Sequence, residues 1–119
     1  MLQSLFQPRP AAPAVATITP AALQRRLDAG EPVHVLDVRS SAEFAHDGRI
    51  AQARLLPLPL LAQRLAEVPR DAEVVLVCRS GQRSGLAAEM LVRHGFDRAL
   101  NLVGGMQAWA RAGLPTVRG

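Results

Sequence analysis

The sequence predicts an α/β domain in which a parallel sheet carries helices on both faces. Residues 33–38 and 73–77 are rich in valine and leucine, and we interpret them as strands that are buried on both sides. Segments of helical character lie between the predicted strands, an order typical of parallel α/β sheets. With 119 residues and no internal repeat, the chain is expected to form one such domain around one hydrophobic core.

The first predicted helix has a clear start and a clear end. Thr19 and Pro20 form the start, with Thr as the N-cap and Pro at the first helical position. The helix is expected to cover residues 21–29, and Gly30 is a suitable C-terminal cap. The buried strand at residues 33–38 follows directly.

A second, shorter helix is predicted after this strand. Ser40 and Glu43 fit a capping box, in which the two residues bond each other's backbone N–H groups, and the helix is expected to continue to about Ala45. Residues 54–56 are a weaker candidate for a strand.

The second half of the chain continues the alternation. Apolar residues at helical spacing predict a helix over residues 58–68, with Leu58, Leu61, Leu65 and Val68 on one face. The remaining predicted elements are a strand at 73–77, a helix at 84–94 closed by Gly95, a strand at 99–102 and a helix at 106–112 closed by Gly113. The carboxyl ends of such strands are where ligands bind in open α/β sheets.

Composition limits the domain organisation and the function. Residues 1–16 hold three of the nine prolines and several alanines, and are expected to form a flexible arm before a domain at 17–119. The net charge is +4, but the arginines are scattered and aromatic residues make up 3%, which disfavours nucleic-acid binding and favours attraction of small anions. No segment is apolar enough to span a membrane, and a single cysteine suits a reducing compartment, so a cytoplasmic protein is expected.

The candidate nucleophile is Cys78, the only cysteine, which ends the strand at 73–77. Six residues with polar, charged or glycine character follow it before the next helix: Arg79, Ser80, Gly81, Gln82, Arg83 and Ser84. The thiolate is the reactive form of cysteine, and a helix N-terminus, nearby arginines and a nest of backbone N–H groups should all lower its pKa. A lone cysteine at the end of a strand is more often a small buried hydrophobe, but two arginines in so short a loop favour a functional site.

The length of this loop separates two kinds of chemistry. In cysteine phosphatases and some arsenate reductases, the arginine of the phosphate-binding loop lies one position further from the cysteine than Arg83 does. The shorter loop predicts a tighter cradle, which suits a terminal sulfur better than a tetrahedral oxyanion.

Four segments, in order, resemble the signatures of single-domain rhodaneses, the thiosulfate sulfurtransferase-like family. They are Leu36-Asp-Val-Arg39 with Glu43-Phe44, Gly48-Arg-Ile50 with Ala53 and Leu56-Pro57, Cys78-Arg-Ser-Gly-Gln-Arg-Ser84, and Gly104-Gly-Met-Gln-Ala-Trp109. They span about residues 17–115. One departure is Arg49, where the family commonly has histidine, and it bears more on local packing or surface charge than on chemistry.

The resemblance implies a rhodanese-like fold, with a five-stranded parallel sheet, and a sulfurtransferase. Cys78 would attack the outer sulfur of thiosulfate or take sulfur from a persulfide donor, and its persulfide would pass the sulfur to cyanide or a thiol in ping-pong kinetics. Backbone amides of residues 79–84 would stabilise the persulfide, while Arg79 and Arg83 would attract the anionic donor. Apart from this covalent persulfide no cofactor is expected, and a thioredoxin-like protein or a cysteine desulfurase is a candidate partner.

Asp37 and Arg39 are also candidate site residues, because they lie at the end of a predicted strand, on the side of the sheet where the site is expected. They form either a structural ion pair or a support for the Cys78 loop. Three histidines and one cysteine without ligand spacing predict no metal site.

Two other functions remain as alternatives to the sulfurtransferase. One is a non-catalytic interaction module of the same fold, and the other, less favoured, is a cysteine phosphatase or arsenate reductase. A persulfide on Cys78 distinguishes the enzyme from the module, and release of phosphate from an aryl phosphate identifies the phosphatase.

Overall fold

A computed structural model of the chain describes residues 14–119, and in that range a five-stranded parallel sheet forms the centre of the molecule. The strands are β1 (Ala16–Ile18), β2 (Val33–Asp37), β3 (Ala53–Leu55), β4 (Glu73–Val77) and β5 (Ala99–Leu102). Their order in the sheet is β1-β5-β4-β2-β3, and every neighbouring pair is parallel. The predicted fold class is confirmed.

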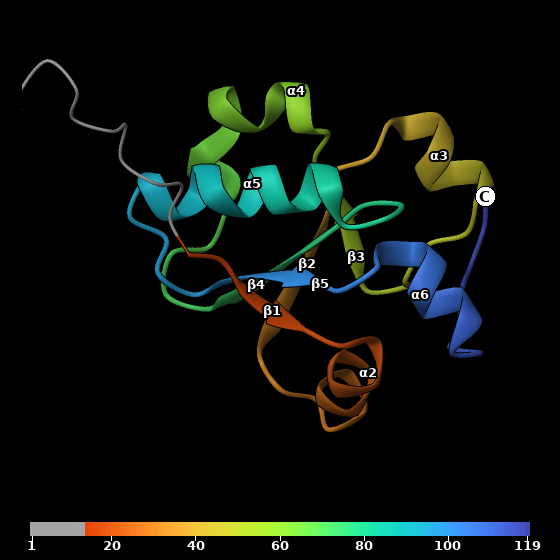
Figure 1. Ribbon diagram of the computed structural model, residues 1–119. Coiled ribbons are helices and arrows are strands. Elements are labelled where there is room, and N and C mark those ends of the chain that lie inside the picture. The colour runs from red at the N-terminus through yellow and green to blue at the C-terminus, as the bar shows by residue number, and fades with distance from the viewer. Residues whose placement is uncertain (1–13) are drawn as a thin grey trace, which may run out of the picture.

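Helices cover both faces of this sheet (Figure 1). They are α2 (Pro20–Asp28), α3 (Ser41–His46), α4 (Leu58–Leu61) with the 3₁₀ helix η1 (Ala62–Glu67), α5 (Gln82–Arg93) and α6 (Gly105–Arg111). In Figure 1, α4 and α5 lie on one face, and α2 and α6 lie on the other. Within residues 14–119, no helix is long and apolar enough to cross a bilayer.

Strand β4 supplies side chains to two separate hydrophobic clusters, one on each face of the sheet. Val74, Leu76 and then Cys78 pack in the cluster that contains the buried residues of α4 and α5. Val75 and Val77 pack in the other cluster, with Trp109 of α6. Successive side chains of a strand point to opposite faces, so an apolar strand of this kind fits only the middle of a covered sheet.

Two elements differ from the sequence prediction. Strand β1 was not predicted, because it is short and at the edge of the sheet, and only Ile18 of its three residues is buried. The single helix expected over residues 58–68 is α4 followed by η1, with non-helical backbone angles at Arg64. Leu61 and Val68 still face the core, since apolar spacing indicates the buried side of a segment but not whether its turns close as α or 3₁₀.

The arm predicted at residues 1–16 lies largely outside the described residues. Of its last residues, Val15 packs against the core and Ala16 belongs to β1.

Candidate active site

Cys78 lies at the carboxyl edge of the sheet, directly after β4, where the sequence analysis placed it. In register with the end of β4, Asp37 of β2 pairs with Val77 and Asn101 of β5 pairs with Leu76. The chain then turns through Gly81, whose φ of +99° a side chain would strain, into the N-terminus of α5. The loop of residues 78–84 therefore joins the middle of the sheet to a helix that starts beside the sulfur.

Hydrogen bonds surround the Cys78 sulfur, which belongs to a residue only 1% exposed. The Gly81 amide donates to Sγ at 3.1 Å, and the Ser84 hydroxyl lies 3.2 Å from it. Burial by itself would raise the pKa of the Cys78 thiol, but hydrogen bonds from the Ser84 hydroxyl and from the Ser84, Gly81 and Ser80 amides outweigh it, and the pKa is lowered. The loop therefore favours a thiolate through directed donors, which agrees with the predicted nest of N–H groups.

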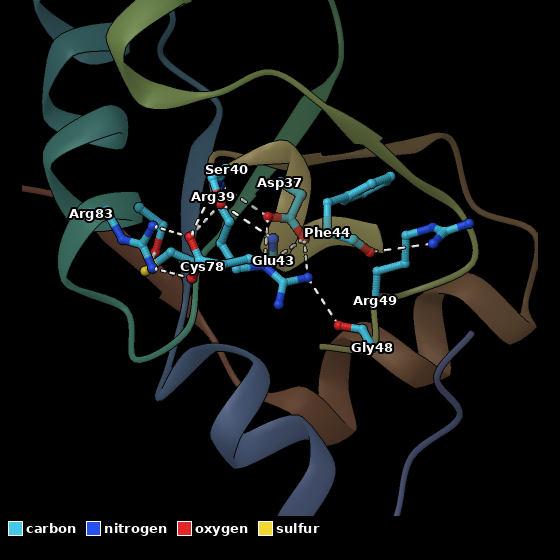
Figure 2. Close-up of polar contacts among 10 residues, drawn as sticks. Asp37, Arg39, Ser40, Glu43, Phe44, Gly48, Arg49, Cys78 and Arg83 are labelled. Atoms are coloured by element: carbon cyan, nitrogen blue, oxygen red, sulfur yellow. Dashed lines mark hydrogen bonds and ion pairs between the residues drawn. The ribbon is translucent and has the colours of Figure 1, made fainter. Parts of the chain in front are cut away.

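Arg83 is already engaged by a carboxylate. Its two Nη atoms bind the oxygens of Glu43 in α3 at 2.7 and 2.8 Å, as Figure 2 shows beside Cys78. This pairing with Arg83 lowers the pKa of Glu43 from 4.5 to about 2. Glu43 therefore balances much of the charge of Arg83, and the attraction of the anionic donor by Arg83 stays a prediction.

Glu43 also fixes the start of helix α3. Its carboxylate accepts from the Ser40 amide at 3.1 Å, and the Ser40 side chain accepts from the Glu43 amide, so the predicted capping box is confirmed. One carboxylate therefore holds both the N-terminus of α3 and an arginine of the Cys78 loop.

Arg79, in contrast, is exposed and borders a cavity of about 410 Å³ beside the loop. The other lining residues are Arg39, Asp47, Met106, Gln107 and Ala110. The amides of Met106 and Gln107 donate to the Cys78 and Arg79 carbonyls at 2.8 and 3.0 Å, so the N-terminus of α6 forms one wall of this cavity and also holds the loop. The exposed guanidinium of Arg79 therefore borders a cavity next to the candidate nucleophile.

Asp37 and Arg39 form a buried ion pair. Arg39 Nε and Nη2 bind the two carboxylate oxygens at 2.9 and 2.8 Å, and Nη2 also donates to the Gly48 carbonyl at 2.9 Å (Figure 2). The structural ion pair considered from the sequence is therefore present. Arg39 connects the end of β2 to the turn after α3, and it reaches the cavity beside Arg79.

The family model of the rhodanese-like domain matches residues 19–112, which include this whole arrangement. The chain belongs to the rhodanese-like domain family. A protein of Allochromatium vinosum named "Sulfurtransferase" is 47% identical over 95 residues, which cover 80% of this chain and 88% of that protein.

Two further relatives place the rhodanese-like chain among single domains and larger proteins. The crystal structure of a rhodanese-related protein from Thermoplasma volcanium is 30% identical with a TM-score of 0.79, covering 87% of this chain and 99% of that one. A protein of Mycobacterium tuberculosis named "Probable adenylyltransferase/sulfurtransferase MoeZ" is 38% identical over 99 residues, which cover 80% of this chain but only 24% of that protein.

The site of this rhodanese-like chain includes a residue that the sequence analysis missed. Asn101 of β5 lies 2.6 Å from the Ser84 hydroxyl through Oδ1, and its Nδ2 donates to the Gly81 carbonyl at 3.0 Å. The available signal was a polar residue in the middle of an otherwise apolar strand next to β4. Without the strand order, that signal does not indicate which loop the side chain contacts.

Proposed function

We propose that the chain is a sulfurtransferase that carries sulfur as a persulfide on Cys78, taken from thiosulfate or a persulfide donor and passed to cyanide or a thiol. One observation carries the proposal: the Cys78 sulfur lies within hydrogen-bond distance of the Gly81 amide and the Ser84 hydroxyl, in a loop that lowers its pKa. Membership of the rhodanese-like family and the names of its relatives support the same class of reaction.

The reaction consists of two displacements at sulfur, with no net oxidation of the protein. The Cys78 thiolate attacks the outer sulfur of thiosulfate, a new S–S bond forms, and sulfite leaves with the electron pair of the broken S–S bond. An acceptor thiolate or cyanide then attacks the outer sulfur of the persulfide, and Cys78 leaves as a thiolate. Because the protein returns to its first state only after the second step, the kinetics are ping-pong, and no cofactor is needed.

The hydrogen-bond donors of the Cys78 loop stabilise a different sulfur atom in the thiolate than in the persulfide. The Ser80, Gly81 and Ser84 amides stabilise the charge on Sγ in the thiolate. We expect the amides of residues 79–84 to stabilise the charge on the outer sulfur in the persulfide. Arg79 is the exposed cation beside the cavity, so it is the better placed of the two loop arginines to attract an anionic donor.

The sulfur acceptor can be a small thiol, or a thiol of another protein that docks at the carboxyl edge of the sheet beside Cys78. Relatives are named as an adenylyltransferase/sulfurtransferase and as a sulfur carrier protein, which fits transfer to or from another protein, such as a thioredoxin-like protein or a cysteine desulfurase. A single cysteine is in keeping with a reducing compartment, and we place the reaction in the cytoplasm.

Replacing Cys78 tests the proposal directly. Thiocyanate formation from thiosulfate and cyanide is expected in the wild type and absent in both Cys78→Ala and Cys78→Ser, since neither side chain can form the persulfide. Mass spectrometry should show one added sulfur on the wild type after thiosulfate treatment, and cyanide should remove it. A wild type that takes sulfur neither from thiosulfate nor from persulfide donors would exclude the enzyme and leave the interaction module of the same fold.

Removing the charge of Glu43 should strengthen donor binding. In Glu43→Gln, Arg83 is released to interact with thiosulfate, and glutamine still serves the capping box, so KM for thiosulfate should fall about two- to fivefold at low salt. Glu67→Gln is the matched control, because it removes the same charge from an exposed ion pair with Arg54 elsewhere. An unchanged KM in Glu43→Gln would show that Arg83 does not act on the donor.

The contacts of Arg83 and the length of the Cys78 loop make a cysteine phosphatase or arsenate reductase a weaker alternative than the sulfurtransferase. Arg83 is held by Glu43, and it lies five positions after Cys78, which leaves a short cradle for a tetrahedral oxyanion. Hydrolysis of an aryl phosphate by the wild type would reverse this preference.

A further inference from the structure

Asn101 is the one side chain of the sheet's interior strands that bonds to two points of the Cys78 loop in the described part of the chain. It lies in β5, between β1 and β4, and its neighbours Leu102 and Leu76 are fully buried. Asn101 itself is half-buried, and the part of a polar side chain that is withdrawn from water is costly unless its hydrogen bonds are satisfied. Both of its bonds go to residues around the nucleophile, which points to a role in setting the state of that nucleophile.

The Ser84 hydroxyl has one hydrogen and two acceptors within reach. Asn101 Oδ1 lies 2.6 Å from Ser84 Oγ, and Cys78 Sγ lies 3.2 Å from it. The amide orientation is set by Asn101 Nδ2, which donates to the Gly81 carbonyl, because the opposite orientation would bring two oxygens together. The amide oxygen carries no hydrogen, so Ser84 donates either to Asn101 or to sulfur, and never fully to both.

We propose that Asn101 is a positioning residue for the Cys78 nucleophile: it gives the Ser84 proton a second acceptor, so that Ser84 donates to sulfur when Sγ is a thiolate and to Asn101 when Sγ is uncharged. Sγ is uncharged in the thiol, which can itself donate to Ser84. It is also uncharged as the inner sulfur of a persulfide, where the charge lies on the outer sulfur. The persulfide half of this inference rests on the proposed function, and the thiol half holds for any reaction of Cys78.

Asn101 affects the pKa of the Cys78 thiol in two ways that have opposite signs, and the two effects can be measured separately. Through Ser84, the amide oxygen stabilises the uncharged sulfur and so raises the pKa of Cys78. Through Gly81, whose amide donates to Sγ, the anchored carbonyl keeps the loop in place for the thiolate. Only the first effect requires the Ser84 hydroxyl.

The charged groups around the loop are the same in every variant needed for the test. They are Arg79, the pair of Arg83 with Glu43, and the pair of Arg39 with Asp37. In the described residues, no hydrogen bond joins any of these side chains to Ser84 or Asn101, so their influence cancels in a comparison of matched variants.

The test is a double-mutant cycle on the pKa of Cys78, measured from the pH dependence of its alkylation by iodoacetamide in the wild type, Asn101→Leu, Ser84→Ala and the double variant. Cys78 is the only cysteine, so the alkylation rate reports this thiol alone. Ser84→Ala should raise the pKa, since it removes the leading donor to Sγ. The shift caused by Asn101→Leu should be lower by about half a pKa unit to one unit when Ser84 is present than when it is absent.

Equal shifts in the two backgrounds would overturn the proposal and leave Asn101 as a structural anchor of Gly81. Asn101→Ala provides the same comparison if the leucine variant does not fold, as judged by circular dichroism. Because the titration uses no sulfur donor, it can fail while thiocyanate formation persists, or succeed while the wild type proves inactive. For the persulfide, Asn101→Leu should accelerate the removal of sulfur by cyanide more when Ser84 is present than in the Ser84→Ala background, because only the effect through Ser84 favours the leaving thiolate.

Discussion

Arg39→Met is expected to lower the free energy of unfolding by about 3–5 kcal/mol, because it leaves the Asp37 carboxylate buried without its cation. Asp37 is 0% exposed and Arg39 is 2% exposed, so the pair is shielded from bulk water. The variant also loses the hydrogen bond from Arg39 to the Gly48 carbonyl. Methionine fills much of the same space, so the loss reflects the charge and its hydrogen bonds rather than a cavity.

Urea unfolding followed by the fluorescence of Trp109, the only tryptophan, measures this loss. Arg54→Met is the control, because it breaks an exposed ion pair with Glu67 and should cost less than about 1 kcal/mol. The double variant Asp37→Leu with Arg39→Met removes both charges and should recover most of the stability. If Arg39→Met cost no more than Arg54→Met, the buried pair would not hold this end of the sheet together.

The predictable parts of the site are those encoded in neighbouring residues. The Cys78 loop is one continuous stretch of sequence, so its residues could be predicted together. Ser40 and Glu43 lie within one helical turn, so their spacing was enough to indicate the capping box. Asp37 and Arg39 were also within reach of the sequence, since they lie at the carboxyl end of a predicted strand, where ligand sites form in parallel sheets.

The parts that could not be predicted depend on contacts between distant segments. Glu43 and Arg83 are separated by 40 residues, and local spacing could assign Glu43 to the cap of α3 but not to an arginine of the Cys78 loop. Asn101 reaches Ser84 and Gly81 only because β5 lies next to β4 in the sheet. The strand order, which the local pattern does not specify, decides both contacts.

The packing of the N-terminus of α6 against the Cys78 loop is another contact between distant segments that the sequence does not specify. Gly104 and Gly105, at the start of the last helix, have positive φ angles of +72° and +58°. The sequence could not show that this helix start packs directly against the nucleophile loop. A Cβ on Gly105 would lie 2.6 Å from the carbonyl carbon of Arg79 and closer still to the Cys78 carbonyl oxygen.

Gly105→Ala should therefore cost about 2–4 kcal/mol of stability, from backbone strain and from the clash with the Cys78 loop, and it should also reduce sulfur transfer. To relieve the clash, α6 must move away, which weakens the bonds from Met106 and Gln107 to the Cys78 and Arg79 carbonyls. Gly113→Ala separates the two causes, because Gly113 has a φ of +72° but no atom within 4 Å of an added Cβ, so it carries the strain alone. Urea unfolding and thiocyanate formation by the two variants test this contact, and equal losses in both would mean that α6 does not hold the loop.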